Sequence, residues 1–237
     1  MPTKAELQTN RAEVLKACLV HVYTGLGLPL AFAALISAAQ GDARGMFILL
    51  MAAIIIDGTD GLMARRFDVS RWTPRFDGRK LDDITDYLTY VFVPMFFMWK
   101  SGLVAGPWVA VLMVGLLASG YGFSNLAAKT DDKHFTGFPS YWNVLAFFLY
   151  LANLPVWLNG LIILILAILV FVPIKFESTQ TLTKFELLLI PFLALGCLYV
   201  LLFDFNNPSP LLIYALTVYP IYHIAHAVIL YVRGDKR

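Results

Sequence analysis

The sequence predicts an all-α polytopic membrane protein with about eight transmembrane helices and both termini in the cytoplasm. Of its 237 residues, 59% are hydrophobic and 14% are charged, whereas about 25% of the residues of a soluble domain are charged. The apolar residues form continuous runs rather than the alternation of a membrane-spanning strand, which favours helices. The net charge of +2 gives no argument for nucleic-acid binding.

Eight apolar runs come close to the roughly 20 residues that a helix needs to cross a bilayer. They cover residues 17–39, 46–66, 81–99, 103–126, 140–156, 157–174, 185–203 and 210–232. The fifth and sixth runs are short and meet at NLPVWLNG, so one alternative is a hairpin that enters the membrane only part-way. The charged residues 1–16, with a weak apolar stripe, predict a helix that lies on the membrane surface.

The basic residues predict how these helices are oriented. With the N-terminus inside, all but two of the 18 Lys and Arg residues lie on the cytoplasmic side, the exceptions being Arg44 and Lys100. The positive-inside rule therefore places both termini in the cytoplasm, which requires an even number of spans. We find no sign of a separate soluble domain, so a single transmembrane domain over residues 1–237 is expected.

Seven of the 16 acidic residues lie in one stretch, DGTDGLMARRFDVSRWTPRFDGRKLDDITD, residues 57–86. Asp57 and Asp60 are three apart near the end of the second run, and Asp82 and Asp86 are four apart at the start of the third. Such spacings put both members of a pair on one helix face. Four converging carboxylates repel one another unless cations lie among them. Hard divalent ions such as Mg²⁺ or Mn²⁺ suit an oxygen-only site, and two of them form the clamp used in phosphoryl transfer.

Other interpretations of this stretch remain open. Asp beside Arg at a helix end also forms ordinary interfacial ion pairs, and the glycines also allow close helix packing. A calcium loop is disfavoured because DGTDG lacks the alternating ligands and the terminal Glu of an EF-hand. A divalent-cation transporter also uses intramembrane carboxylates, but more often near the bilayer midplane.

The stretch resembles the signature of the CDP-alcohol phosphotransferases. The pattern is Asp-x-x-Asp-Gly-x-x-Ala-Arg, then Gly-x-x-x-Asp-x-x-x-Asp, here at Asp57, Asp60, Gly61, Ala64, Arg65, Gly78, Asp82 and Asp86. Two departures, the additional Gly58 and a long gap of twelve residues between Arg65 and Gly78, look like the bacterial phosphatidylcholine synthase branch. The segment FTGFPSYWN, residues 135–143, is also similar to that branch.

The resemblance implies a CDP-alcohol phosphotransferase-like helical bundle in the bacterial inner membrane, with the active site facing the cytoplasm. The implied reaction moves the phosphatidyl group of CDP-diacylglycerol to free choline and releases CMP. A sibling enzyme that uses serine or glycerol phosphate is the alternative within the family. A homodimer fits the family as well.

The same resemblance implies the roles of the motif residues. Asp57, Asp60 and Asp82 would bind Mn²⁺ or Mg²⁺, two ions in all, with Asp86 as a further ligand and as general base. The nucleotide pocket would consist of Gly61, Ala64, Arg65 and Gly78.

Aromatic side chains are candidates for binding choline, because a quaternary ammonium is recognised by aromatic faces. Tyr121, Phe123, Tyr141 and Trp142 lie near the expected cytoplasmic ends of the fourth and fifth runs. Trp and Tyr also gather at membrane interfaces for unrelated reasons. His21, alone in the first run, is expected to pack or to form a hydrogen bond.

Overall fold

The computed structural model describes residues 10–125, 134–176 and 184–233, and these are mostly helical. The chain divides into two compact units, one up to Val93 and one from Pro94 onward. The motif stretch lies entirely in the first unit. The single domain expected from the sequence stays a prediction.

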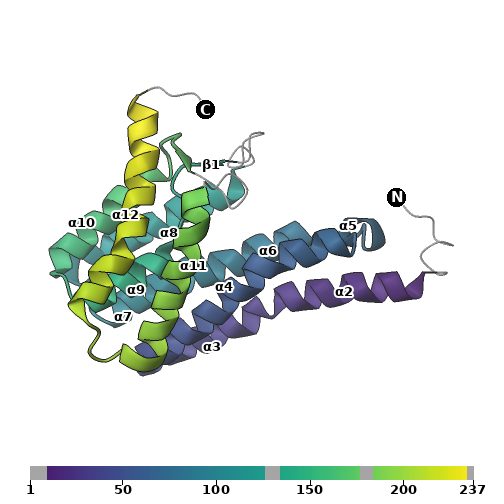
Figure 1. Ribbon diagram of the computed structural model, residues 1–237, viewed down its shortest axis with the longest axis horizontal. Coiled ribbons are helices and arrows are strands. Elements are labelled where there is room, and N and C mark those ends of the chain that lie inside the picture. Colours follow the sequence, from purple (N-terminus) through teal and green to yellow (C-terminus); the bar gives the residue numbers. More distant parts are fainter. Residues whose placement is uncertain (1–9, 126–133, 177–183, 234–237) are drawn as a thin grey trace. The chain divides into compact units, whose positions relative to one another are not determined.

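The first unit consists of a long helical rod and the helices that pack along it (Figure 1). Its elements are α2 (Arg11–Gly25), α3 (Gly27–Gln40), α4 (Ala43–Arg66), α5 (Val69–Trp72), α6 (Gly78–Asp86) and the π-helix η1 (Tyr87–Phe92). Helices α2 and α3 are separated only by Leu26, which keeps helical dihedral angles. Helix α4 packs against both of them, and so does α6.

Side-chain caps fix where the two acidic helices begin. Asp42 accepts a hydrogen bond from the backbone N–H of Gly45 (2.8 Å) at the start of α4. Asp77 accepts one from the N–H of Lys80 (3.1 Å) at the start of α6. Each cap satisfies a backbone donor that has no partner within the helix.

A glycine allows α6 to approach α3 closely. The methyl group of Thr85 occupies the space where a Cβ on Gly27 would stand, and Thr85 is 6% exposed. Thr85 lies between Asp82 and Asp86 in the sequence but on the buried side of α6. This contact therefore seats the helix that carries two of the motif carboxylates.

The second unit is built from helices and one very short strand pair. Its elements are α7 (Val93–Lys100, whose first residue falls in the first unit), η2 (Gly106–Trp108), α8 (Val109–Ser124), β1 (Phe135–Thr136), α9 (Trp142–Ala152), α10 (Val156–Leu169), β2 (Lys175–Phe176), α11 (Lys184–Tyr199), η3 (Val200–Asp204) and α12 (Pro210–Val232). The strands pair antiparallel, Phe135 with Phe176 and Thr136 with Lys175. The described residues are mostly helical, as expected, and this short pair, formed where two segments far apart in the sequence meet, is a local addition that the apolar runs did not predict.

Helices occur at each of the eight expected places, but their lengths differ. Within the described residues, four helical segments are long and apolar enough to cross a membrane: Arg11–Gln40, Ala43–Arg66, Gly106–Ser124 and Pro210–Val232. Helices α9 and α10 have 11 and 14 residues, hence lengths of about 16 and 21 Å, against a hydrocarbon core of about 30 Å. These lengths agree with the alternative of a hairpin that enters the membrane only part-way.

The surface helix expected over residues 1–16 stays a prediction. Its residues 11–16 continue into the rest of α2 without a break, and residues 1–9 lie outside the described residues. Lys129 and Lys133, two of the basic residues counted for the orientation, also lie outside the described residues. The total of eight spans and the cytoplasmic position of both termini stay predictions.

Candidate metal centre and active site

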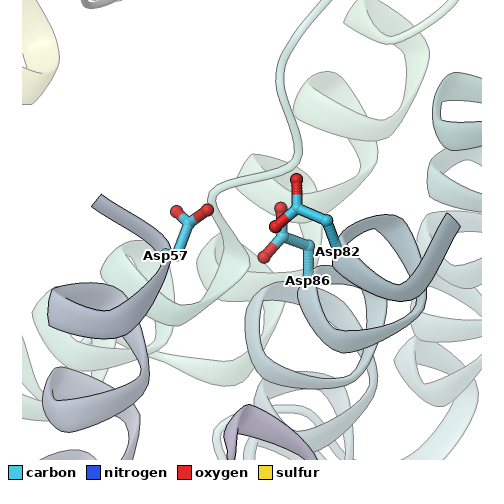
Figure 2. A group of neighbouring side chains, drawn as sticks. All are labelled: Asp57, Asp82 and Asp86. Atoms are coloured by element: carbon cyan, nitrogen blue, oxygen red, sulfur yellow. The ribbon is translucent and has the colours of Figure 1, made fainter. Parts of the chain in front are cut away.

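Three motif carboxylates lie together in the first unit. Asp57 comes from α4, whereas Asp82 and Asp86 come from α6. One carboxylate oxygen from each of the three residues lies within 4.8 Å of the other two. Figure 2 shows the three carboxylates facing a common space between the two helices. All three side chains are half-buried. Each of the three residues offers a carboxylate oxygen as its ligand atom, and oxygen is the ligand that hard divalent cations prefer.

The fourth motif carboxylate, Asp60, is not a member of this group. It is 6% exposed and its Oδ2 accepts a hydrogen bond from the hydroxyl of Thr24 on α2 (2.7 Å). A buried carboxylate needs such a donor to offset the loss of water. The convergence of all four carboxylates predicted from the spacing is thus seen for three, with Asp60 held one helical turn away on α4.

Tyr90 is a residue of this site that the sequence analysis missed. Its hydroxyl donates a hydrogen bond to Asp57 Oδ2 (2.7 Å), which links η1 to α4. The spacing contains a signal for it, because Asp82, Asp86 and Tyr90 follow one another at intervals of four residues and so lie along one helix face. On the other side of α4, the hydroxyls of Tyr23 and Thr59 are hydrogen-bonded to each other (2.8 Å).

The small motif residues have different surroundings. A Cβ on Gly61 would lie 3.5 Å from an Arg65 guanidinium nitrogen, an ordinary contact, and one on Gly58 would meet no atom within 4 Å. Ala64 instead packs against the apolar cluster formed by Ala17, Val20 and Val69. Helix α4 therefore leaves open space at Gly58 and room for a small side chain at Gly61. Ala64 takes part in the packing of α4 against α2.

Gly78 faces His21. A Cβ on Gly78 would lie 2.7 Å from His21 Cε1, so the imidazole occupies the space that the missing side chain leaves. His21 Nε2 is also hydrogen-bonded to Thr73 Oγ1 (2.8 Å), and its ring lies 4.3 Å from that of Phe76. The expectation that His21 packs and forms a hydrogen bond is confirmed.

The aromatic residues expected at choline all lie in the second unit. Trp142 is fully buried and its Nε1 donates a hydrogen bond to Ser119 Oγ (2.7 Å), which gives it a packing role and argues against a choline contact. Tyr121 is half exposed, with its ring 5.1 Å from that of Phe171, and Tyr141 is 36% exposed. For Tyr121 and Tyr141, choline binding stays a prediction.

Comparison with known proteins shows the family. The profile of the CDP-alcohol phosphatidyltransferases matches residues 15–173, which include the whole acidic motif. The chain is 34% identical over 197 residues to the phosphatidylcholine synthase of Borreliella burgdorferi, covering 83% of this chain and 84% of that protein. It is 41% identical over 157 residues to the phosphatidylcholine synthase of Bradyrhizobium diazoefficiens (65% and 58% covered) and 37% identical over 163 residues to that of Pseudomonas aeruginosa (68% of each). The chain therefore belongs to the CDP-alcohol phosphatidyltransferase family.

Proposed function

We propose that this protein transfers the phosphatidyl group of CDP-diacylglycerol to free choline, giving phosphatidylcholine and CMP. The supporting observation is the cluster of Asp57, Asp82 and Asp86, two helices contributing carboxylates to one space inside the family's signature. The phosphatidylcholine synthases that resemble the chain over most of its length favour choline as the acceptor.

The cluster fits divalent cations, because its donors are carboxylate oxygens close enough to share an ion. Asp57, Asp82 and Asp86 would bind Mn²⁺ or Mg²⁺, and Asp60 would contribute through its second oxygen, Oδ1. When bound, such ions, two in this proposal, neutralise the diphosphate of CDP-diacylglycerol and stabilise the charge on the departing phosphate of CMP.

Asp86 is the proposed general base. One of its carboxylate oxygens takes the proton of the choline hydroxyl while the choline oxygen forms its bond to the lipid-bearing phosphorus. The bond from that phosphorus to the bridging oxygen breaks, and CMP leaves with the bond's electron pair. Because a carboxylate is a weak base for an alcohol, proton transfer accompanies formation of the new bond.

Arg65 is the proposed ligand of the substrate phosphates. Its side chain is exposed, and among the described residues it forms no ion pair, so the guanidinium is available for a bidentate contact with phosphate oxygens. It extends beside Gly61, and the space left by Gly61 and Gly58 is where we place the nucleotide. Ala64 and Gly78 would affect the shape of that pocket indirectly, because they determine how α4 and α6 pack.

The position of the cluster suits a substrate that is half lipid. Asp57 lies toward the end of α4 that carries Arg65 and Arg66, and basic residues mark the cytoplasmic side under the positive-inside rule. We therefore place the site at the cytoplasmic face of the bacterial inner membrane. There the acyl chains stay in the bilayer while CDP and choline are in contact with water.

Comparison of acceptors tests the proposal. Purified protein is incubated with CDP-diacylglycerol, Mn²⁺ and labelled choline, serine or glycerol phosphate, and the lipid product is identified. The proposal requires phosphatidylcholine as the main product. Phosphatidylserine or phosphatidylglycerophosphate would instead assign a sibling reaction, and Mn²⁺ flux into proteoliposomes without CMP release would indicate a transporter.

A further inference from the structure

The hydrogen bond from Tyr90 to Asp57 joins the two helices that form the carboxylate cluster. The residues are 33 positions apart, and the oxygen–oxygen distance is 2.7 Å with both groups half-buried. An ionised carboxylate only accepts hydrogen bonds, so the phenol is the donor. A hydrogen bond to a charged acceptor is roughly twice as strong as one between neutral groups.

This bond determines how the carboxylate of Asp57 is turned. The carboxylate is planar, so holding Oδ2 in one place also restricts where Oδ1 points. Asp57 is the one member of the cluster that comes from α4. Its orientation therefore decides whether α4 contributes a carboxylate oxygen to the cluster beside the two from α6.

The helix that follows α6 is shaped to present Tyr90 at this place. Asp82 and Asp86 lie on α6, and Tyr90 continues the same four-residue spacing within the π-helical segment Tyr87–Phe92. In an α-helix of 3.6 residues per turn, a spacing of four drifts around the axis. The wider π-helical turn counters that drift, and such turns are frequent at functional sites.

We propose that Tyr90 is a positioning residue of the metal centre, which orients the Asp57 carboxylate so that it shares a cation with Asp82 and Asp86. The inference rests on the proposed function, because it requires that the cluster binds a divalent cation. It goes beyond the signature motif, which ends at Asp86 and does not include Tyr90. Removing a partner that orients a metal ligand weakens metal affinity by about 10- to 100-fold.

Replacing one oxygen atom tests this role. The variant is Tyr90→Phe, and the matched control is Tyr23→Phe. The control removes a phenol hydroxyl from the same unit, but the hydrogen-bond partner of that hydroxyl is Thr59 rather than a carboxylate. Mn²⁺ affinity of the detergent-purified protein is measured by calorimetry without lipid substrate. We expect about tenfold weaker binding in Tyr90→Phe and no loss in Tyr23→Phe. Excess Mn²⁺ restores turnover in Tyr90→Phe, with an unchanged KM for choline.

A double variant shows whether Tyr90 acts through Asp57. In an Asp57→Asn background, Tyr90→Phe is expected to cause no further loss of Mn²⁺ affinity. A further tenfold loss there contradicts the inference, as does equal Mn²⁺ affinity of Tyr90→Phe and the unchanged protein. If the unchanged protein itself binds no Mn²⁺, the metal site fails, and the role of Tyr90 fails with it. If the unchanged protein binds Mn²⁺ and Tyr90→Phe binds it equally well, the metal site stands and only the role of Tyr90 fails.

Discussion

The imidazole of His21 fills the space beside Gly78, where an added Cβ would lie only 2.7 Å from His21 Cε1. The same imidazole is hydrogen-bonded to Thr73 and lies against the ring of Phe76. Helix α6 begins at Gly78 and carries Asp82 and Asp86. His21 therefore fixes where the second half of the acidic motif begins relative to α2.

The first prediction concerns this contact. Gly78→Ala is expected to lower turnover at least about tenfold, because a displacement near 1 Å at a catalytic helix is enough for losses of that order or more. The second variant, Gly78→Ala with His21→Ala, removes the clash and is expected to recover part of the lost turnover. Phosphatidylcholine formation is measured in both.

A glycine in open space provides the control for stability. No atom lies within 4 Å of a Cβ added at Gly58, so Gly58→Ala is expected to keep or raise the midpoint of thermal inactivation. Equal activity of Gly78→Ala and the unchanged protein would show that the contact with His21 does not position α6.

The second prediction concerns Thr24 and Asp60. Thr24→Val removes the donor to a buried carboxylate and is expected to lower the free energy of unfolding by about 1–3 kcal/mol, with a loss of turnover. Thr24→Ser keeps a hydroxyl and is expected to retain most of the stability and most of the turnover. A Thr24→Val protein with unchanged thermal midpoint and unchanged activity would show that the hydrogen bond is unimportant. The thermal midpoint and the activity of both variants are measured in the same detergent.

The third prediction separates the two aromatic neighbours in the second unit. Trp142→Leu loses a buried ring and the hydrogen bond to Ser119, so it is expected to lower the free energy of unfolding by about 2 kcal/mol or more. Tyr141→Leu is expected to leave stability nearly unchanged and to raise the KM for choline more than that for CDP-diacylglycerol. Equal rises in both KM values would count against a choline contact at Tyr141.

The fourth prediction concerns the proposed base. Asp86→Asn keeps the size of the side chain but cannot take a proton from choline, so turnover is expected to fall by at least about 100-fold. Binding of labelled CDP-diacylglycerol is expected to remain measurable. Normal turnover of this variant would remove Asp86 from the role of base.

The helical part of this fold was predictable because its signals are local. Continuous apolar runs gave the positions of the helices, and the spacing of Asp82 and Asp86 gave their common face. The β1–β2 pair was not predictable, because two residues of strand form only where segments about 40 positions apart meet and carry no periodicity of their own. Trp142 shows the same limit: its expected position near a membrane interface did not reveal that its ring is buried.

The pairing of side chains from different helices was also beyond sequence patterns, although the four-residue spacing marks Tyr90 as a residue on the face of Asp82 and Asp86. Thr24 and Asp60 are 36 positions apart, Tyr90 and Asp57 are 33 apart, and His21 and Thr73 are 52 apart. Each pair depends on how whole helices pack, which spacing within one helix does not determine. The motif predicted that Asp57, Asp82 and Asp86 lie together, but not that Asp60 lies apart from them. The packing of α2 and η1 determines how Asp60 and Asp57 are held.

The most direct test measures both products of one reaction. Purified protein in mixed micelles receives CDP-diacylglycerol labelled in the cytidine and choline carrying a second label, with and without Mn²⁺. Phosphatidylcholine and CMP are expected in equal amounts, with both lost on chelation by EDTA and restored by added Mn²⁺, and neither formed by Asp57→Asn. Release of CMP without labelled phosphatidylcholine, or undiminished synthesis after chelation, would contradict a metal-dependent transfer to choline at this cluster.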